Sequence, residues 1–148
     1  MCASLALFRS MNEVKVFFPN PAARILCRTK SGVIVNAVWD RQNGKKDPES
    51  GFPVTGWPRL ENIRKLKWDR FNGGKVHIPA TAYMEKDQKK QSHWFQLEKK
   101  QFLVGILLRN QDFKIVYVVT VPTPAEFRHI HDHWVLINQL TGVGKPAL

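Results

Sequence analysis

The stretch that decides the fold is "KVHIPATAYMEKDQKKQSHWFQLEKKQFLVGILL", from Lys75 to Leu108. Short hydrophobic runs alternate in it with polar turns, a pattern typical of β-strands. Residues 75–85 predict a strand that runs into a turn or a second strand, and "KDQKKQS" predicts a hairpin loop. Residues 93–108 predict two more strands about the "KK" turn. Strands therefore dominate the centre of the chain.

The flanking sequence predicts further strands and two helices. Strands are expected at 14–18, at 24–39 with a turn near Ser31-Gly32, at 113–121 and at 134–137. Residues 58–71 predict a basic helix that begins at Pro58 and ends at "NGG". Thr123 and Glu126 have the spacing of a capping box, which predicts a short helix there. Because strands outnumber helices, we expect an α+β fold with a mostly antiparallel sheet or partial barrel and a few short helices.

The length of 148 residues is that of one domain, expected at 1–140 and followed by a flexible tail at 141–148. Residues 40–58 are rich in Gly, Pro and charge and predict a long surface loop. Such loops are often functional. No apolar run is long enough to span a membrane, and the start lacks the pattern of a signal peptide. Two cysteines fit a reducing compartment. We therefore expect a cytoplasmic or nucleoid-associated protein.

The chain is strongly basic, with 23 Lys plus Arg against 12 Asp plus Glu and a formal charge of +11. This charge favours a polyanionic partner, and nucleic acid above all, because neutralised phosphates release counterions. It argues against an acidic mimic of DNA. The alternative is charge that serves solubility alone. Of the five tryptophans, Trp39 and Trp57 flank the long loop and are the best candidates for stacking on bases.

Cys2 directly follows the initiator methionine. Removal of Met1 would leave an amine and a thiol on neighbouring atoms. The amine has a pKa of about 7.7–8.0, so part of it is neutral and nucleophilic near pH 7. Such a pair can condense with an aldehyde to a Schiff base and close to a thiazolidine ring. The alternative is that Cys2 is only a small residue that permits trimming.

Two further segments offer groups that could move protons. "RHIHDHW" holds three histidines and an aspartate between Arg128 and Trp134. It invites a zinc site, but the chain lacks a C-x-x-C pair and offers only His77 and His93 as other histidines. We expect no metal or other cofactor, and an acid–base histidine instead. Glu85 follows an apolar strand, where burial would raise its pKa, although a solvated hairpin glutamate is the alternative.

In order and spacing, several motifs resemble those of the SOS-response-associated peptidase family, which shields abasic sites in single-stranded DNA. They are "MC", "PRLEN" before a basic helix that ends in "WDRF", "VHIPATAYMEKD", "HWFQL…QFLVGILL" and "VVTVPTPAEFRHIHDHWVLI". The resemblance covers most of the chain. It implies the family's fold, single-stranded DNA as the partner, and a covalent DNA–protein crosslink at abasic sites.

The resemblance also implies roles for particular residues. The family's nucleophile corresponds to Cys2, its glutamate to Glu85 and its histidine to His131, which together would form the thiazolidine. Its phosphate-contacting arginine corresponds to Arg59. The basic groove would continue along the following helix, through Arg64, Lys67 and Arg70.

The chain departs from the family pattern at several positions. Trp57 stands at the place of the motif asparagine, His133 at that of an arginine, and Ala3-Ser4 at that of Gly-Arg. An alternative function is therefore a module on the same fold without the chemistry, which binds single-stranded DNA or blocks a host protein. The small size indicates a phage or mobile-element origin. Whether the protein is an enzyme of the lyase or peptidase class depends on which alternative holds.

Overall fold

The computed structural model describes residues 2–9, 12–17, 23–39, 58–64 and 74–139. Its centre is a closed five-stranded barrel with the strand order β8-β5-β3-β4-β9, and a β8–β9 pairing closes the ring. Only the β4–β9 pair is parallel. The barrel strands are β3 (Arg24–Thr29), β4 (Ile34–Trp39), β5 (Gly74–Ile78), β8 (Gln101–Arg109) and β9 (Lys114–Val118).

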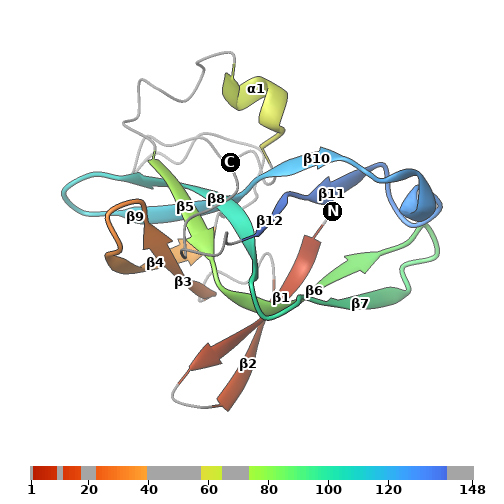
Figure 1. The fold of residues 1–148 in the computed structure, drawn as a ribbon, viewed down its shortest axis with the longest axis horizontal. Helices are drawn as coiled ribbons and strands as arrows, with labels where there is room; N and C mark the ends of the chain where they lie inside the picture. The colour runs from red at the N-terminus through yellow and green to blue at the C-terminus, as the bar shows by residue number, and fades with distance from the viewer. Residues whose placement is uncertain (1, 10–11, 18–22, 40–57, 65–73, 140–148) are drawn as a thin grey trace.

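A four-stranded sheet lies against the barrel, with the order β2-β1-β6-β7 (Figure 1). Pro79 separates β5 from β6, so one nearly continuous segment leaves the barrel and enters this sheet. The four strands are β1 (Cys2–Arg9), β2 (Asn12–Phe17), β6 (Ala80–Lys86) and β7 (Ser92–Gln96).

Short elements complete the described fold. β10 (Thr120–Pro122) pairs with β11 (His133–Val135), and β12 (Ile137–Gln139) pairs with β8. Helix α1 (Leu60–Arg64) has five residues, and η2 (Ala125–Phe127) is one 3₁₀ turn. No helix in the described part of the chain is both long and apolar enough to cross a membrane.

Strand β8 is apolar throughout because both of its faces are covered. Leu103 and Leu107 point into the barrel and join the main core, whereas Phe102, Val104 and Ile106 point outward into a second cluster. Leu60 of α1 packs on that second cluster. Gly105 is needed on the inner face, since a Cβ there would lie 2.9 Å from Ile78 Cδ1. Alternating inward and outward side chains thus explain the long hydrophobic run.

The main core also connects the barrel to the four-stranded sheet. Leu5 of β1 and Tyr83 of β6 belong to the same buried cluster as Ile25 and Trp39 of the barrel. Full burial of each large apolar side chain contributes roughly 1.5–3 kcal/mol. This shared core fixes the position of the four-stranded sheet on the barrel.

Two turns form where the sequence predicted them. The β3–β4 hairpin turns at Ser31-Gly32 as expected, with Gly32 at φ 90°. The β6–β7 loop is a hairpin, in which Asp87 Oδ1 accepts hydrogen bonds from the backbone N–H groups of Lys89 and Gln91, both at 2.9 Å. Side-chain acceptance by aspartate replaces the usual Asn-Gly turn.

The described part of the chain is mostly β, and its helical elements are the five-residue α1 and the single 3₁₀ turn η2. The α+β expectation is therefore corrected to a mostly β fold, and the partial barrel is a closed one. Of the expected helix at 58–71, the structure describes Leu60–Arg64 as α1, and residues 65–73 lie outside the described part. The capping box at Thr123 is wrong: Pro124 occupies the N-cap of η2 without a side-chain hydrogen bond, and the Thr123 hydroxyl is buried instead. The expected tail at 141–148 also lies outside the described residues.

Candidate active site

Glu85 is fully buried near the end of β6. Residues two apart in a strand share a face, so Glu85 points to the same side of the sheet as Tyr83. Tyr83 faces the main core and stacks on Phe95 of β7, with ring centroids 5.3 Å apart. The carboxyl group therefore lies at the edge of an aromatic cluster, and it is not the solvated hairpin glutamate considered as an alternative.

Burial raises the pKa of Glu85 from 4.5 to about 7, and the positive chain terminus opposes the rise. Moving a carboxylate out of water disfavours its charged form. A group with a pKa of about 7 is half protonated near neutral pH, so it can both donate and accept a proton. This is the property that the sequence predicted for a carboxyl group behind an apolar strand.

The backbone register brings Cys2 to this carboxyl group. β1 runs antiparallel to β6, and Cys2 is the direct partner of Glu85 in the pairing. Directly opposed residues of antiparallel strands have Cα atoms about 4.5–5.5 Å apart. The register shifts between Cys2 and Ser4, which marks a β-bulge directly after the Cys2–Glu85 pair. Bulges often re-aim residues next to active sites.

His131 lies in the segment between η2 and β11, and this segment is anchored to β6. The indole N–H of Trp134 donates a buried hydrogen bond of 2.8 Å to the Tyr83 hydroxyl. Phe127 stacks on Trp134 with centroids 5.1 Å apart, and it meets Phe95 edge-on. These contacts place the segment on the face of β6 to which Tyr83 points, and by the two-residue repeat of a strand Glu85 points to the same face.

The electrostatics of His131 connect it to the same place. Burial lowers its pKa, and the positive amino terminus lowers it further, while Asp132 acts in the opposite direction. The terminus also acts on the pKa of Glu85, so it lies within electrostatic range of both groups. The charge of the amino terminus therefore acts on the pKa of both Glu85 and His131.

The surroundings of His131 provide for two protonation states. Its Nδ1 accepts the backbone N–H of His133 at 3.2 Å and lies 2.9 Å from Asp132 Oδ1. The neutral ring with its proton on Nε2 satisfies the first contact, and the protonated ring satisfies the second. A histidine that is held in both states can take up and return a proton.

His93 is a member of this site that the sequence mentioned only as a spare metal ligand. It is the direct partner of Glu85 on β7, so a cross-strand row runs from Cys2 through Glu85 to His93. Its Nε2 lies 2.8 Å from Asp87 Oδ2, and the hydrogen bond from His93 is the largest cause of a lowered pKa at Asp87. The sequence alone could have identified His93 as the partner of Glu85, because a hairpin centred on Lys89 pairs residue 85 with residue 93.

The three histidines of the "HIHDH" segment do not share a strand face. The strand begins only at His133, whose Nδ1 lies 3.5 Å from Asp132 Oδ1, while His129 is exposed. Within residues 2–9, 12–17, 23–39, 58–64 and 74–139, no group of three or more His, Cys, Asp or Glu side chains is arranged to hold a metal ion.

Of the residues predicted to contact DNA, the structure describes Arg59, Arg64 and Trp39. Arg59 is exposed and forms an isolated bridge with Thr120 of β10, the strand that pairs with β11. Arg59 is thus separated from the His133–Val135 strand by β10 alone. Arg64 is the last residue of α1. Trp57, Lys67 and Arg70 lie outside the described residues.

Trp39 requires a correction. It is the last residue of β4, is 1% exposed and packs in the main core. Its position next to the long loop in sequence indicated a surface ring, but the inward phase of β4 buries it. A fully buried ring cannot stack on a base, so Trp39 is a core residue of the barrel.

No protein-family model matches the chain, and no curated protein matches it at a significant level.

Proposed function

We propose that the protein binds single-stranded DNA and captures abasic sites covalently through Cys2 after removal of Met1. The observation that carries this proposal is the pairing of Cys2 with Glu85 across β1 and β6. Trimming would move the free amine to Cys2, directly opposite a buried carboxyl group with a pKa of about 7. The resemblance to the SOS-response-associated peptidase family supports the same residues.

The chemistry is a condensation that needs no co-reactant. The Cys2 amine attacks the aldehyde carbon of the ring-opened deoxyribose, and loss of water gives an imine. The thiol then adds to the imine carbon, so a C–S bond forms and the thiol proton ends on nitrogen. The net products are a thiazolidine and one water molecule.

Glu85 and His131 are suited to the proton transfers of this sequence. The neutral carboxyl group of Glu85 can protonate the departing oxygen as the imine forms, and its carboxylate can then accept the thiol proton. His131 can return a proton to nitrogen. Positioned acid–base groups contribute about 10²–10⁴-fold to such steps.

A denaturing gel with an abasic single-stranded oligonucleotide tests the proposal. We expect a shifted protein–DNA band with the intact chain, and a much weaker band with Cys2→Ser, which keeps the amine but cannot form the thiazolidine. Intact mass of the same sample reports whether Met1 has been removed. A trimmed protein that gives no band, or a Cys2→Ser band of full strength, would refute the thiazolidine mechanism.

The second candidate is a binding module that holds single-stranded DNA without reacting. Trp57 in place of the motif asparagine and His133 in place of the arginine favour it. It predicts equal, salt-dependent affinity for undamaged and abasic strands, and no crosslink. If the protein binds neither strand, the remaining candidate is a protein partner.

A further inference from the structure

The outer face of β3 and β5 carries exposed cations. Arg28 and Lys75 point outward because their neighbours Cys27 and Val76 are buried inside the barrel. No cation of this face forms an ion pair with any residue that the structure describes. We name as the basic wall these cations together with those that border the same face: Arg28, Lys30, Lys75, Lys99 and Lys100 of the β7–β8 turn, and Arg109 at the end of β8.

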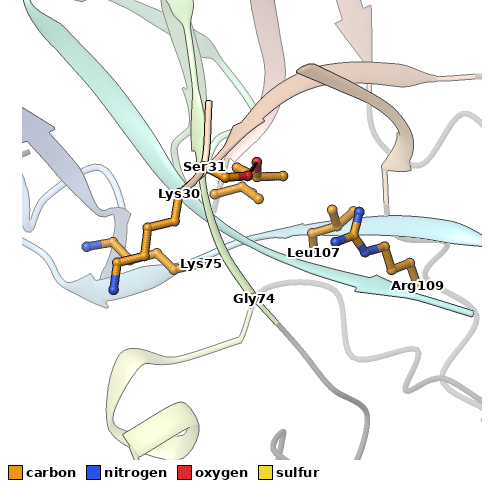
Figure 2. Close-up of a pocket in the computed structure, with 8 residues that line it drawn as sticks. Lys30, Ser31, Gly74, Lys75, Leu107 and Arg109 are labelled. Carbon is orange, nitrogen blue, oxygen red and sulfur yellow. Dashed lines mark hydrogen bonds between the residues drawn. The ribbon is translucent and has the colours of Figure 1, made fainter. Parts of the chain in front are cut away.

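An open cavity of about 400 Å³ lies in the basic wall, between the β3–β4 turn, the start of β5 and the end of β8. Lys30 and Lys75 run side by side along one side of it, and Arg109 lies on the other (Figure 2). The hydroxyl of Ser31 adds a polar group, 3.1 Å from the Thr29 hydroxyl. Among the described residues, no acidic side chain lines this cavity.

The two lysines lie just beyond the last residue pair of the β3–β5 ladder. Thr29 pairs with Val76; Lys30 follows Thr29 in the β3–β4 turn and Lys75 precedes Val76 on β5, so the two lysines lie side by side (Figure 2). Like charges that lie side by side repel each other. An anion between them would reverse that cost, since each ammonium could donate hydrogen bonds to it. The pair is therefore better explained as a binding site than as a structural contact.

A second, smaller cavity of about 160 Å³ follows along the same face, lined by Arg28, Lys99 and Lys100. His77 also lines it and stacks on Phe102 with ring centroids 4.0 Å apart. Burial lowers the pKa of His77, and the charges of Lys75 and Arg28 lower it further, as expected in a positive field. Successive cationic cavities beside a ring are typical of grooves that follow a single strand.

We propose that the basic wall binds the phosphodiester backbone of single-stranded DNA, with successive phosphates in the two cavities. The site is distinct from the Glu85 site: the six steps from Pro79 to Glu85, at about 3.3 Å each, span roughly 20 Å along the strand. The wall would hold the strand that flanks a captured lesion. This inference extends the proposed function and rests on DNA as the partner, but it needs no crosslinking.

The test is fluorescence anisotropy with an undamaged, end-labelled oligonucleotide of about 20 nucleotides, at salt from about 50 to 200 mM. The variant Lys30→Ala/Lys75→Ala removes two wall cations. Its control, Lys15→Ala/Lys89→Ala, removes two exposed cations from β2 and the β6–β7 turn. Each phosphate contact to a single strand contributes about 0.7 to the salt slope, so the wall variant should lose about 1.4. The ratio of the wall variant's Kd to the wild-type Kd should therefore be about sevenfold larger at about 50 mM salt than at about 200 mM salt.

The control should keep the wild-type slope, and inorganic phosphate should compete no better than chloride of equal ionic strength. Equal weakening in both variants would show that only net charge matters and would overturn the proposal. A wall variant with the wild-type slope would do the same, as would displacement of the strand by inorganic phosphate. The undamaged strand carries no aldehyde, so failure of Cys2 chemistry leaves this result unaffected.

Discussion

Replacing Glu85 with glutamine should change how the stability of the protein depends on pH. In the folded protein the pKa of Glu85 is raised to about 7, against an ordinary value of 4.5. Between these values the folded chain keeps a proton that the unfolded chain releases, so the free energy of unfolding falls as pH rises. The stability contributed by the protonated group is fully present below pH 4.5 and is lost as pH passes about 7.

The magnitude follows from the same two values. At about 1.4 kcal/mol per pH unit, the interval corresponds to about 3 kcal/mol. Glutamine has nearly the same shape and never ionises, so Glu85→Gln should match the wild type at pH 4 and exceed it by about 3 kcal/mol at pH 8. For a chain of this length, that corresponds to a gain of about 6–12 °C in Tm.

The assay is urea or thermal denaturation of both proteins at intervals from pH 4 to 8.5. The difference between the two curves isolates Glu85, because all other titrating groups are common to both proteins. A difference that stays constant across this range would refute the argument that Glu85 is buried and titrates near neutrality. Glu85→Gln should also lose most of its crosslinking activity. The denaturation and crosslinking measurements therefore report separately on the effect of Glu85 on stability and on its proposed role in proton transfer.

Three further predictions concern the site and its supports. His131→Gln should slow single-turnover crosslinking about 10²-fold without weakening binding of undamaged DNA, and an unchanged rate would remove His131 from the proton transfers. Tyr83→Phe leaves the buried indole N–H of Trp134 without its acceptor and should cost about 1–3 kcal/mol in denaturant unfolding; a loss below about 0.5 kcal/mol would contradict the importance of that hydrogen bond. Gly105→Ala should cost about 1–3 kcal/mol because its Cβ would lie 3.0 Å from the Tyr117 carbonyl oxygen. Gly74→Ala, where a Cβ meets nothing within 4 Å, is its control, and equal losses would refute the packing argument.

Local patterns were sufficient to predict most of the strands. Alternation and turn residues gave β3 and β4, the β6–β7 hairpin, and the two halves of residues 75–85, since these signals depend on neighbours in the chain. The carboxyl group at the end of β6 was predicted for the same reason. An apolar strand that ends in a glutamate places that group at the edge of a core.

Features that depend on pairings distant in sequence were not predicted. Closure of the barrel requires the parallel β4–β9 pair, whose partners are more than seventy residues apart in the sequence. That closure turns Trp39 inward, whereas proximity to a polar loop had indicated exposure. The pairing of β1 with β6, which sets Cys2 opposite Glu85, has no local signal at all.

The short helix at Thr123 was over-predicted because the capping-box pattern reflects local sequence alone. At Thr123 the capping-box pattern competes with burial. The hydroxyl lies inside the protein, and η2 is a single 3₁₀ turn.

Intact mass spectrometry of the protein after exposure to an abasic single-stranded oligonucleotide tests the central claim most directly. The proposed mechanism predicts a chain that lacks Met1 and gains the mass of the oligonucleotide less one water molecule, stable to denaturation. In Cys2→Ser the yield of this adduct should be much lower. A trimmed wild-type chain without any adduct, or an adduct of equal yield in Cys2→Ser, would contradict covalent capture by Cys2.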